Sequence, residues 1–128
     1  GSPATNFLHG KIEGKYFVYK HMKIELPEMF AESLKAYDGK EVIMGVRPED
    51  LYGEGIVAET YPTSTFNMEV EVAELLGHEY ILHGKFEDQD IAAKVSSRLD
   101  TEAHSTLKLT MDLSKVHFFD KETELRID

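Results

Sequence analysis

The sequence predicts a mostly β fold with minor α content, either a small barrel or a sandwich. This prediction rests on three observations. Most of the chain alternates apolar and polar residues with period two, which is typical of strands that bury one face. Turn-forming residues separate the alternating runs, and only one segment has helical spacing. The clearest alternation sets Leu107, Leu109, Met111 and Leu113 against Lys108, Thr110 and Asp112. Many short strands separated in this way favour a barrel or a sandwich.

The other expected strands follow in chain order. Residues 22–26, 68–72 and 80–86 alternate, so each strand is expected to bury one face. Residues 42–46 are apolar on both faces, which predicts a strand in the middle of a sheet. Turns are expected at 13–14, 38–39, 52–55 and 87–90, where glycine or polar residues gather.

A single helix is expected over residues 27–37. Pro27 suits the first helical position, and Gly39 follows just past the end. Phe30, Leu34 and Tyr37 recur at i, i+4 and i+7 and therefore share one face. A second, single helical turn is expected at residues 112–115.

Charge and composition exclude several classes of function. The 128 residues suffice for one domain with its own core, and the net charge is −10, with 14 basic residues against 24 acidic ones. Nucleic-acid binding needs clustered Lys and Arg, and anionic lipid surfaces attract the same residues. No apolar run approaches the roughly 20 residues that span a bilayer, and cysteine is absent. We therefore expect no nucleic-acid partner and no membrane insertion.

Motifs for catalysis fail when their spacing is checked. Gly-Lys occurs at residues 10, 14, 39 and 84, but Ser or Thr never follows, so no phosphate-binding loop forms. His78 and His83 would not share a face of a helix or a strand, so a shared metal is not expected. No Gly-x-Ser-x-Gly elbow occurs. We expect no active site, cofactor or metal in this chain, and an unrecognised carboxylate pair is the remaining enzymatic alternative.

Two charged residues are expected at the edge of the core. Glu74 has the parity of Val70 and Val72, so an uninterrupted strand would point its carboxylate inward, and Arg47 directly follows the apolar strand 42–46. Buried charges need partners. One interpretation is that Arg47 forms an ion pair or hydrogen-bond cluster with Glu49 or Glu74, and the other is that a bulge at Glu74 turns it to solvent.

Four ordered motifs resemble the C-terminal domain of ATPases from ABC importers. Residues 1–8, Gly-Ser-Pro-Ala-Thr-Asn-Phe-Leu, resemble the junction with the motor domain, and 45–50 contain the Gly-Val-Arg-Pro-Glu motif with Arg47, Pro48 and Glu49. Residues 74–83 match a segment of the maltose and multiple-sugar transporter group, with Glu74, Gly77 and His83. Residues 117–123 resemble its ending, with His117, Phe119 and Asp120, although Glu124 replaces the usual glycine.

The resemblance implies an all-β, OB-fold-like β-barrel with one short helix, the transport-associated OB domain of the maltose, multiple-sugar and glycerol-phosphate transporter group. Residues 1–128 would form a single regulatory domain, with 1–8 as the junction from an ATPase domain outside this chain, where ATP and Mg²⁺ would bind. The resemblance also implies a non-catalytic role in stabilising the ATPase homodimer and regulating it. Permease subunits and, in some relatives, a regulatory protein are the further partners, and the location is the cytoplasmic side of the cell membrane. The alternative is an OB-like domain that senses a small molecule or an oxyanion.

Overall fold

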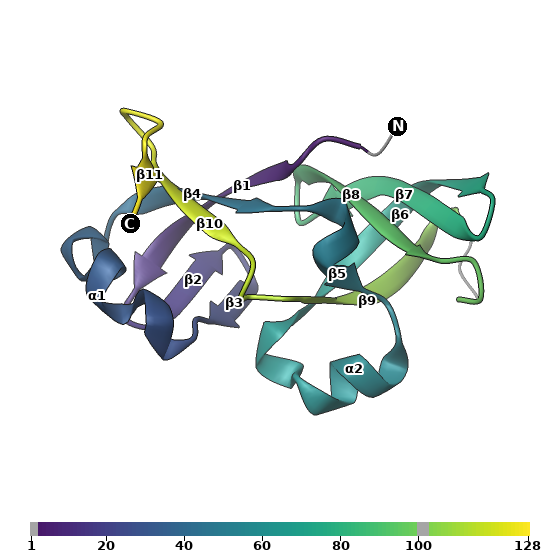
Figure 1. The fold of residues 1–128 in the computed structure, drawn as a ribbon, viewed down its shortest axis with the longest axis horizontal. Helices are drawn as coiled ribbons and strands as arrows, with labels where there is room; N and C mark the ends of the chain where they lie inside the picture. Colours follow the sequence, from purple (N-terminus) through teal and green to yellow (C-terminus); the bar gives the residue numbers. More distant parts are fainter. Residues whose placement is uncertain (1–2, 100–102) are drawn as a thin grey trace.

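The computed structural model describes residues 3–99 and 103–128, so Gly1 and Ser2 of the junction motif lie outside the described residues. Within these residues the strands form two sheets, one of six strands and one of five. Figure 1 shows the two sheets side by side along the long axis of the molecule. The chain crosses from the first half to the second after β4 and returns after β9. The predicted β-rich fold class is confirmed.

The first sheet has the order β11-β10-β4-β1-β2-β3. Its strands are β1 (Asn6–Glu13), β2 (Tyr16–Tyr19), β3 (Met22–Glu25), β4 (Glu41–Val46), β10 (His117–Asp120) and β11 (Arg126–Ile127). Strand β4 lies in the middle, between β1 and β10, as its apolar residues on both faces predicted. Buried Phe17 and Phe118 pack with ring centroids 6.1 Å apart in the core of this half.

The second sheet has the order β5-β9-β6-β7-β8 and contains one irregularity whose position the sequence did not reveal. Its strands are β5 (Leu51–Tyr52), β6 (Thr65–Leu76), β7 (Glu79–Phe86), β8 (Gln89–Ser96) and β9 (Ser105–Met111). The β6–β7 register shifts between Val70 and Val72, so Glu71 is an extra, bulged residue. Because side chains alternate along a strand, one extra residue reverses the faces of all that follow.

The segment predicted as a helix is helical, and it buries the predicted face. It comprises the 3₁₀ turn η1 (Glu28–Phe30), helix α1 (Ala31–Leu34) and the 3₁₀ turn η2 (Lys35–Tyr37). Leu34 is buried, and Phe30 and Tyr37 pack against the core. Pro27 has extended backbone at the N-cap, so it precedes the helix and is not its first residue.

Other helical segments were missed or misjudged. Helix α2 (Gly55–Thr60) and the 3₁₀ turns η3 (Pro48–Asp50) and η4 (Pro62–Ser64) were not predicted. None of the residues 55–60 of α2 is buried, so the helix leaves no apolar periodicity in the sequence. Residues 112–115 form a hydrogen-bonded turn, with Lys115 N–H donating to the Asp112 carbonyl at 3.1 Å, and no helix.

Two side-chain amides join the halves at a seam between β1 and β8. Asn6 on β1 donates to the carbonyl of Ala92 and accepts from its N–H, both at 2.8 Å. Gln89 on β8 makes the same pair of bonds with the backbone of His9, also at 2.8 Å. Each amide replaces the backbone bonds that a neighbouring strand would make. Buried residues of both sheets also form one continuous core.

In the described part of the chain, no helix has the length and hydropathy to cross a membrane.

Candidate interaction surface

Three of the four recognised motifs converge on the outer face of the first sheet. Phe7 lies directly opposite Gly45, and Gly45 lies opposite His117 on the other side of β4. The rings of Phe7 and Phe119 meet edge to face, with centroids 5.8 Å apart and planes at 72°. We call Phe7, Gly45 and Phe119 the aromatic face.

Gly45 makes room for the two rings. A Cβ atom at this position would lie 3.1 Å from the Phe119 ring and 3.6 Å from the Phe7 ring. The missing side chain therefore lets both rings settle over β4. Phe7 nevertheless remains 57% exposed, so a large apolar ring faces solvent at the start of β1.

The remaining motif, residues 74–83, borders the aromatic face at a cavity of about 410 Å³. Phe7 of β1 and Thr5 just before that strand line it on one side, and Glu71 and His83 of the β6–β7 hairpin line it on the other. Residues of the motifs 1–8 and 74–83 thus line one cavity, although they are far apart in sequence.

The expected cluster of Arg47 with Glu49 or Glu74 is wrong. Arg47 and Glu74 are both exposed, and across residues 3–99 and 103–128 Arg47 forms no ion pair with either carboxylate. The bulge at Glu71 turns Glu74 outward, where its Oε1 lies 3.5 Å from Nε2 of His83. The structure supports the alternative interpretation in that a bulge exposes Glu74, but the bulge lies at Glu71 and not at Glu74 as expected.

The buried carboxylate near this motif is Asp50, which sequence reasoning missed. Pro48 starts the turn η3, whose Asp50 N–H donates to the carbonyl of Arg47 at 3.0 Å. Asp50 is 6% exposed, and Nζ of Lys115 lies 3.8 Å from its carboxylate. Glu49 is exposed on the same turn. The buried acid of the Arg-Pro-Glu-Asp segment therefore contacts the residues that connect β9 to β10.

Gly77 and Asp120 build turns. Gly77 has φ +64° and begins the two-residue connection between Leu76 and Glu79, a conformation that glycine adopts at little cost. Asp120 Oδ1 accepts the N–H groups of Glu122 and Thr123, both at 2.9 Å, and Oδ2 accepts the Tyr37 hydroxyl at 2.8 Å.

These hydrogen bonds shift the pKa values of Asp120 and Tyr37. The N–H of Thr123 and then the Tyr37 hydroxyl lower the pKa of Asp120 below its usual range. The same contact raises the pKa of Tyr37. Glu124, which replaces the usual glycine, keeps the turn by adopting φ +63°, a conformation that strains a residue with a side chain.

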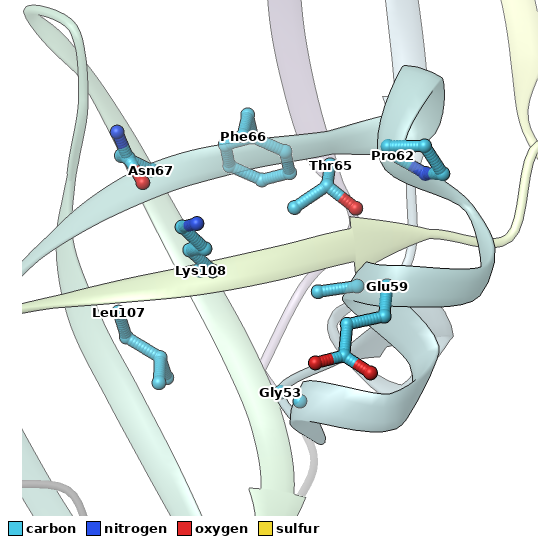
Figure 2. A pocket seen from close by; sticks show the side chains of 10 residues that line it. Gly53, Glu59, Pro62, Thr65, Phe66, Asn67, Leu107 and Lys108 are labelled. Carbon is cyan, nitrogen blue, oxygen red and sulfur yellow. The ribbon is translucent and has the colours of Figure 1, made fainter.

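A second surface, drawn in Figure 2, is a groove of about 530 Å³ between α2 and the strands β6 and β9. Figure 2 shows Lys108 and Asn67 on the strands and Glu59 on the helix. The lining contains one cation, Lys108, and one carboxylate, Glu59, so its net charge is zero. In the part of the chain that the structure describes, no three His, Asp or Glu residues gather as a metal site would require.

Comparison with known proteins supports the resemblance that the motifs indicated. Residues 1–51 match the family model described as the MalK OB fold domain. The chain is 42% identical to the oligosaccharides import ATP-binding protein MsmX of Bacillus subtilis, over 99% of the chain and 35% of that protein. It is 40% identical to the multiple sugar-binding transport ATP-binding protein MsmK of Streptococcus mutans, over 99% of the chain and 34% of that protein. The chain thus spans about one third of these curated relatives.

A solved structure supports the fold alone. The cytoplasmic molybdate-binding protein ModG superposes with a TM-score of 0.67 at 16% identity, over 88% of this chain and 94% of that one. Together, the family match and the similarity along the chain confirm the relationship predicted from the four motifs: this is an OB-fold domain of the kind found at the C-terminal end of ATP-binding proteins of ABC sugar importers.

Proposed function

We propose that this chain is the non-catalytic regulatory and dimer-stabilising domain of the ATP-binding subunit of an ABC carbohydrate importer. The observation that carries the proposal is the aromatic face, where Phe7 is 57% exposed beside Phe119. An exposed aromatic ring on a sheet built by three motifs is a good anchor for a protein partner, because aromatic side chains dominate the binding energy of interfaces. The partner we assign to it is a second copy of the same subunit.

In the whole protein, the remaining two thirds would hold ATP and Mg²⁺ and contact the permease subunits. The relatives are named as an import and a transport ATP-binding protein, which supports this division. The domain described here would stand at the cytoplasmic face of the membrane without entering it. A regulatory protein would act by favouring or opposing contact between the two subunits.

The experiment is light scattering on the 128-residue chain over a range of concentrations. We expect a mass that rises toward that of a dimer, and Phe7→Ser to weaken association at least about tenfold because it removes the exposed ring. Leu75→Ser is the matched control, since Leu75 is 59% exposed but lies on the β6–β7 hairpin. Circular dichroism would verify that both variants fold.

Two results would contradict the proposal. A chain that stays monomeric at every concentration does not stabilise a dimer. Equal association of the wild-type chain and Phe7→Ser, with loss in Leu75→Ser, would move the contact to the hairpin and overturn the assignment of the aromatic face.

A further inference from the structure

A groove of about 580 Å³ lies between segments that no recognised motif includes. It is lined by the end of β3 and the start of the α1 segment, by β5 and the α2–η4 segment, and by the residues that end and follow β9. Figure 1 locates these segments where the two halves of the molecule meet, on the side of α2. The volume is within the range of about 300–1,000 Å³ that small-molecule pockets occupy. We call it the tyrosine groove.

Three large, mainly apolar side chains are exposed on the walls of the tyrosine groove. Two of them are tyrosines and also carry a polar hydroxyl. Tyr61 is 58% exposed and Tyr52 is 36% exposed, and Met29 is 62% exposed. Buried Met111 and Leu113 also line the groove. Tyrosine in such a site offers a flat apolar ring and a hydroxyl together, which suits a ligand that is apolar on one face and hydroxylated at its edge.

The lining of the groove does not favour anionic ligands. Among the described residues that line it there is no Lys, Arg or His, and there are two acids, Glu25 and Asp112. A phosphate or an oxyanion would meet carboxylates without a compensating cation in the lining. The groove therefore does not suit the oxyanions considered from the sequence.

The two acids are also poorly placed to attract a cation, because each already has a partner. Glu25 Oε1 lies 3.1 Å from Nζ of Lys15. Asp112 accepts the N–H of Ser114 at 3.1 Å and its hydroxyl at 2.6 Å, and Nζ of Lys115 lies 3.8 Å away. What the groove offers is consequently close to neutral.

Several hydroxyl groups in the groove have no partner within the described chain. The hydroxyl of Thr110 is bonded to that of Thr65 at 2.8 Å, and the hydroxyl of Ser114 is bonded to Asp112. By contrast, the hydroxyls of the other lining residues make no side-chain hydrogen bond to any described residue: Tyr52, Tyr61, Thr63 and Ser64. Each can donate to and accept from a ligand.

We propose that the tyrosine groove binds a neutral carbohydrate of one or two rings. A sugar ring presents C–H groups on one face, which pack on an aromatic ring, and hydroxyls around its edge, which bond with Tyr, Thr and Ser hydroxyls. This inference goes beyond the dimer-stabilising role and does not depend on it, since the aromatic face and the tyrosine groove share no residue. It gives the small-molecule alternative a place and a ligand class.

The test is saturation-transfer NMR on the 128-residue chain with glucose, maltose and sucrose as probes. Irradiating the aromatic protons of the protein should transfer saturation to the ring protons of at least one neutral sugar. Glucose 6-phosphate, which adds a phosphate to the same ring, should bind more weakly than glucose. Glucosamine, which adds a cation, should gain nothing over glucose, because both carboxylates are already paired.

Variants locate the site. Tyr61→Ala and Tyr52→Ala should each weaken sugar binding about threefold to tenfold, the range expected for one lost aromatic contact. Ile56→Ala is the matched control, because Ile56 is 69% exposed on α2 but does not line the groove, and it should leave binding unchanged. All three positions are exposed enough for the fold to survive.

Each contrary result overturns the proposal. Saturation transfer to none of the three neutral sugars at millimolar concentration would show that the groove takes no carbohydrate. Binding that is unchanged in both tyrosine variants would place the sugar elsewhere. Tighter binding of glucose 6-phosphate than of glucose would contradict the argument from charge.

Discussion

Helix α1 covers the core of its half, whereas helix α2 lies against the outside of the other half. Leu34 of α1 is 4% exposed, and Phe30 just before it meets Phe118 edge to face with ring centroids 5.1 Å apart. No residue of α2, which spans 55–60, is buried, and its Ile56 is 69% exposed. The helix that is part of the core can be recognised in the sequence, because burial imposes a period on its apolar residues.

The two helices also differ in whether they border a proposed binding surface. Helix α2 buries none of its residues, and exposed side chains next to it line two grooves. Both grooves that border α2 are lined by residues that the motif resemblance left unassigned, among them Tyr61 and Lys108. In the other half, three of the recognised motifs build the aromatic face and the turn at Asp120, whereas the motif 74–83 forms the β6–β7 turn in the same half as α2.

The largest expected effect tests this comparison directly. Leu34→Ala should reduce the free energy of unfolding by about 2–4 kcal/mol, because it removes a buried side chain and leaves a cavity. Ile56→Ala should change it by less than about 0.5 kcal/mol, as exposed positions do. Urea denaturation followed by circular dichroism measures both. Equal losses would show that α2 also supports the core.

The seam between the halves should come next. Asn6→Ala leaves the carbonyl and N–H of Ala92 and the carbonyl of Val46 without their amide partner, and Asn6 is only 7% exposed. We expect a loss of about 2–3 kcal/mol from these unsatisfied groups.

Gln89→Ala is the control at the solvent-exposed end of the seam. It leaves the backbone of His9 open to water, which can replace the lost bonds, so the loss should stay below about 1 kcal/mol. The same urea titration compares the two variants. If Gln89→Ala costs as much as Asn6→Ala, burial does not set the strength of this seam.

A substitution in the final turn should raise the free energy of unfolding, whereas those above lower it. Glu124 holds φ +63°, where a side chain is strained, whereas the β6–β7 turn has Gly77 at φ +64°. Glu124→Gly should raise the free energy of unfolding by about 0.5–1 kcal/mol, since relief of this strain exceeds the added entropy of the unfolded chain. Thermal unfolding of the two proteins decides the sign. A lower midpoint for Glu124→Gly would mean that the glutamate makes a favourable contact that outweighs the strain.

The smallest effects on stability are expected for Glu74 and Arg47, the two charges that the sequence predicted at the edge of the core. Glu74→Gln removes an exposed pair with His83, and Arg47→Gln removes a charge that lies on the surface. Each should change the free energy of unfolding by less than about 0.5 kcal/mol. A loss above about 1 kcal/mol in either variant would restore the buried-cluster interpretation.

The sequence could be read where local chemistry and burial agree. The alternation of 107–113, the two-sided apolar run 42–46 and the face shared by Phe30, Leu34 and Tyr37 predicted real elements, because each pattern records contact with the core. The four motifs predicted the relationship to sugar-importer ATP-binding proteins. These properties follow from residue types at fixed spacings.

What only the tertiary structure decided is which residues meet and which face solvent. One bulged residue, Glu71, reversed the faces of the rest of β6, and no residue type announces such a bulge. The aromatic face depends on the register of β1, β4 and β10, and the tyrosine groove on three segments brought together by packing. Periodicity records whether a side chain is buried, but contacts between distant segments are set by the closure of the whole chain around its core.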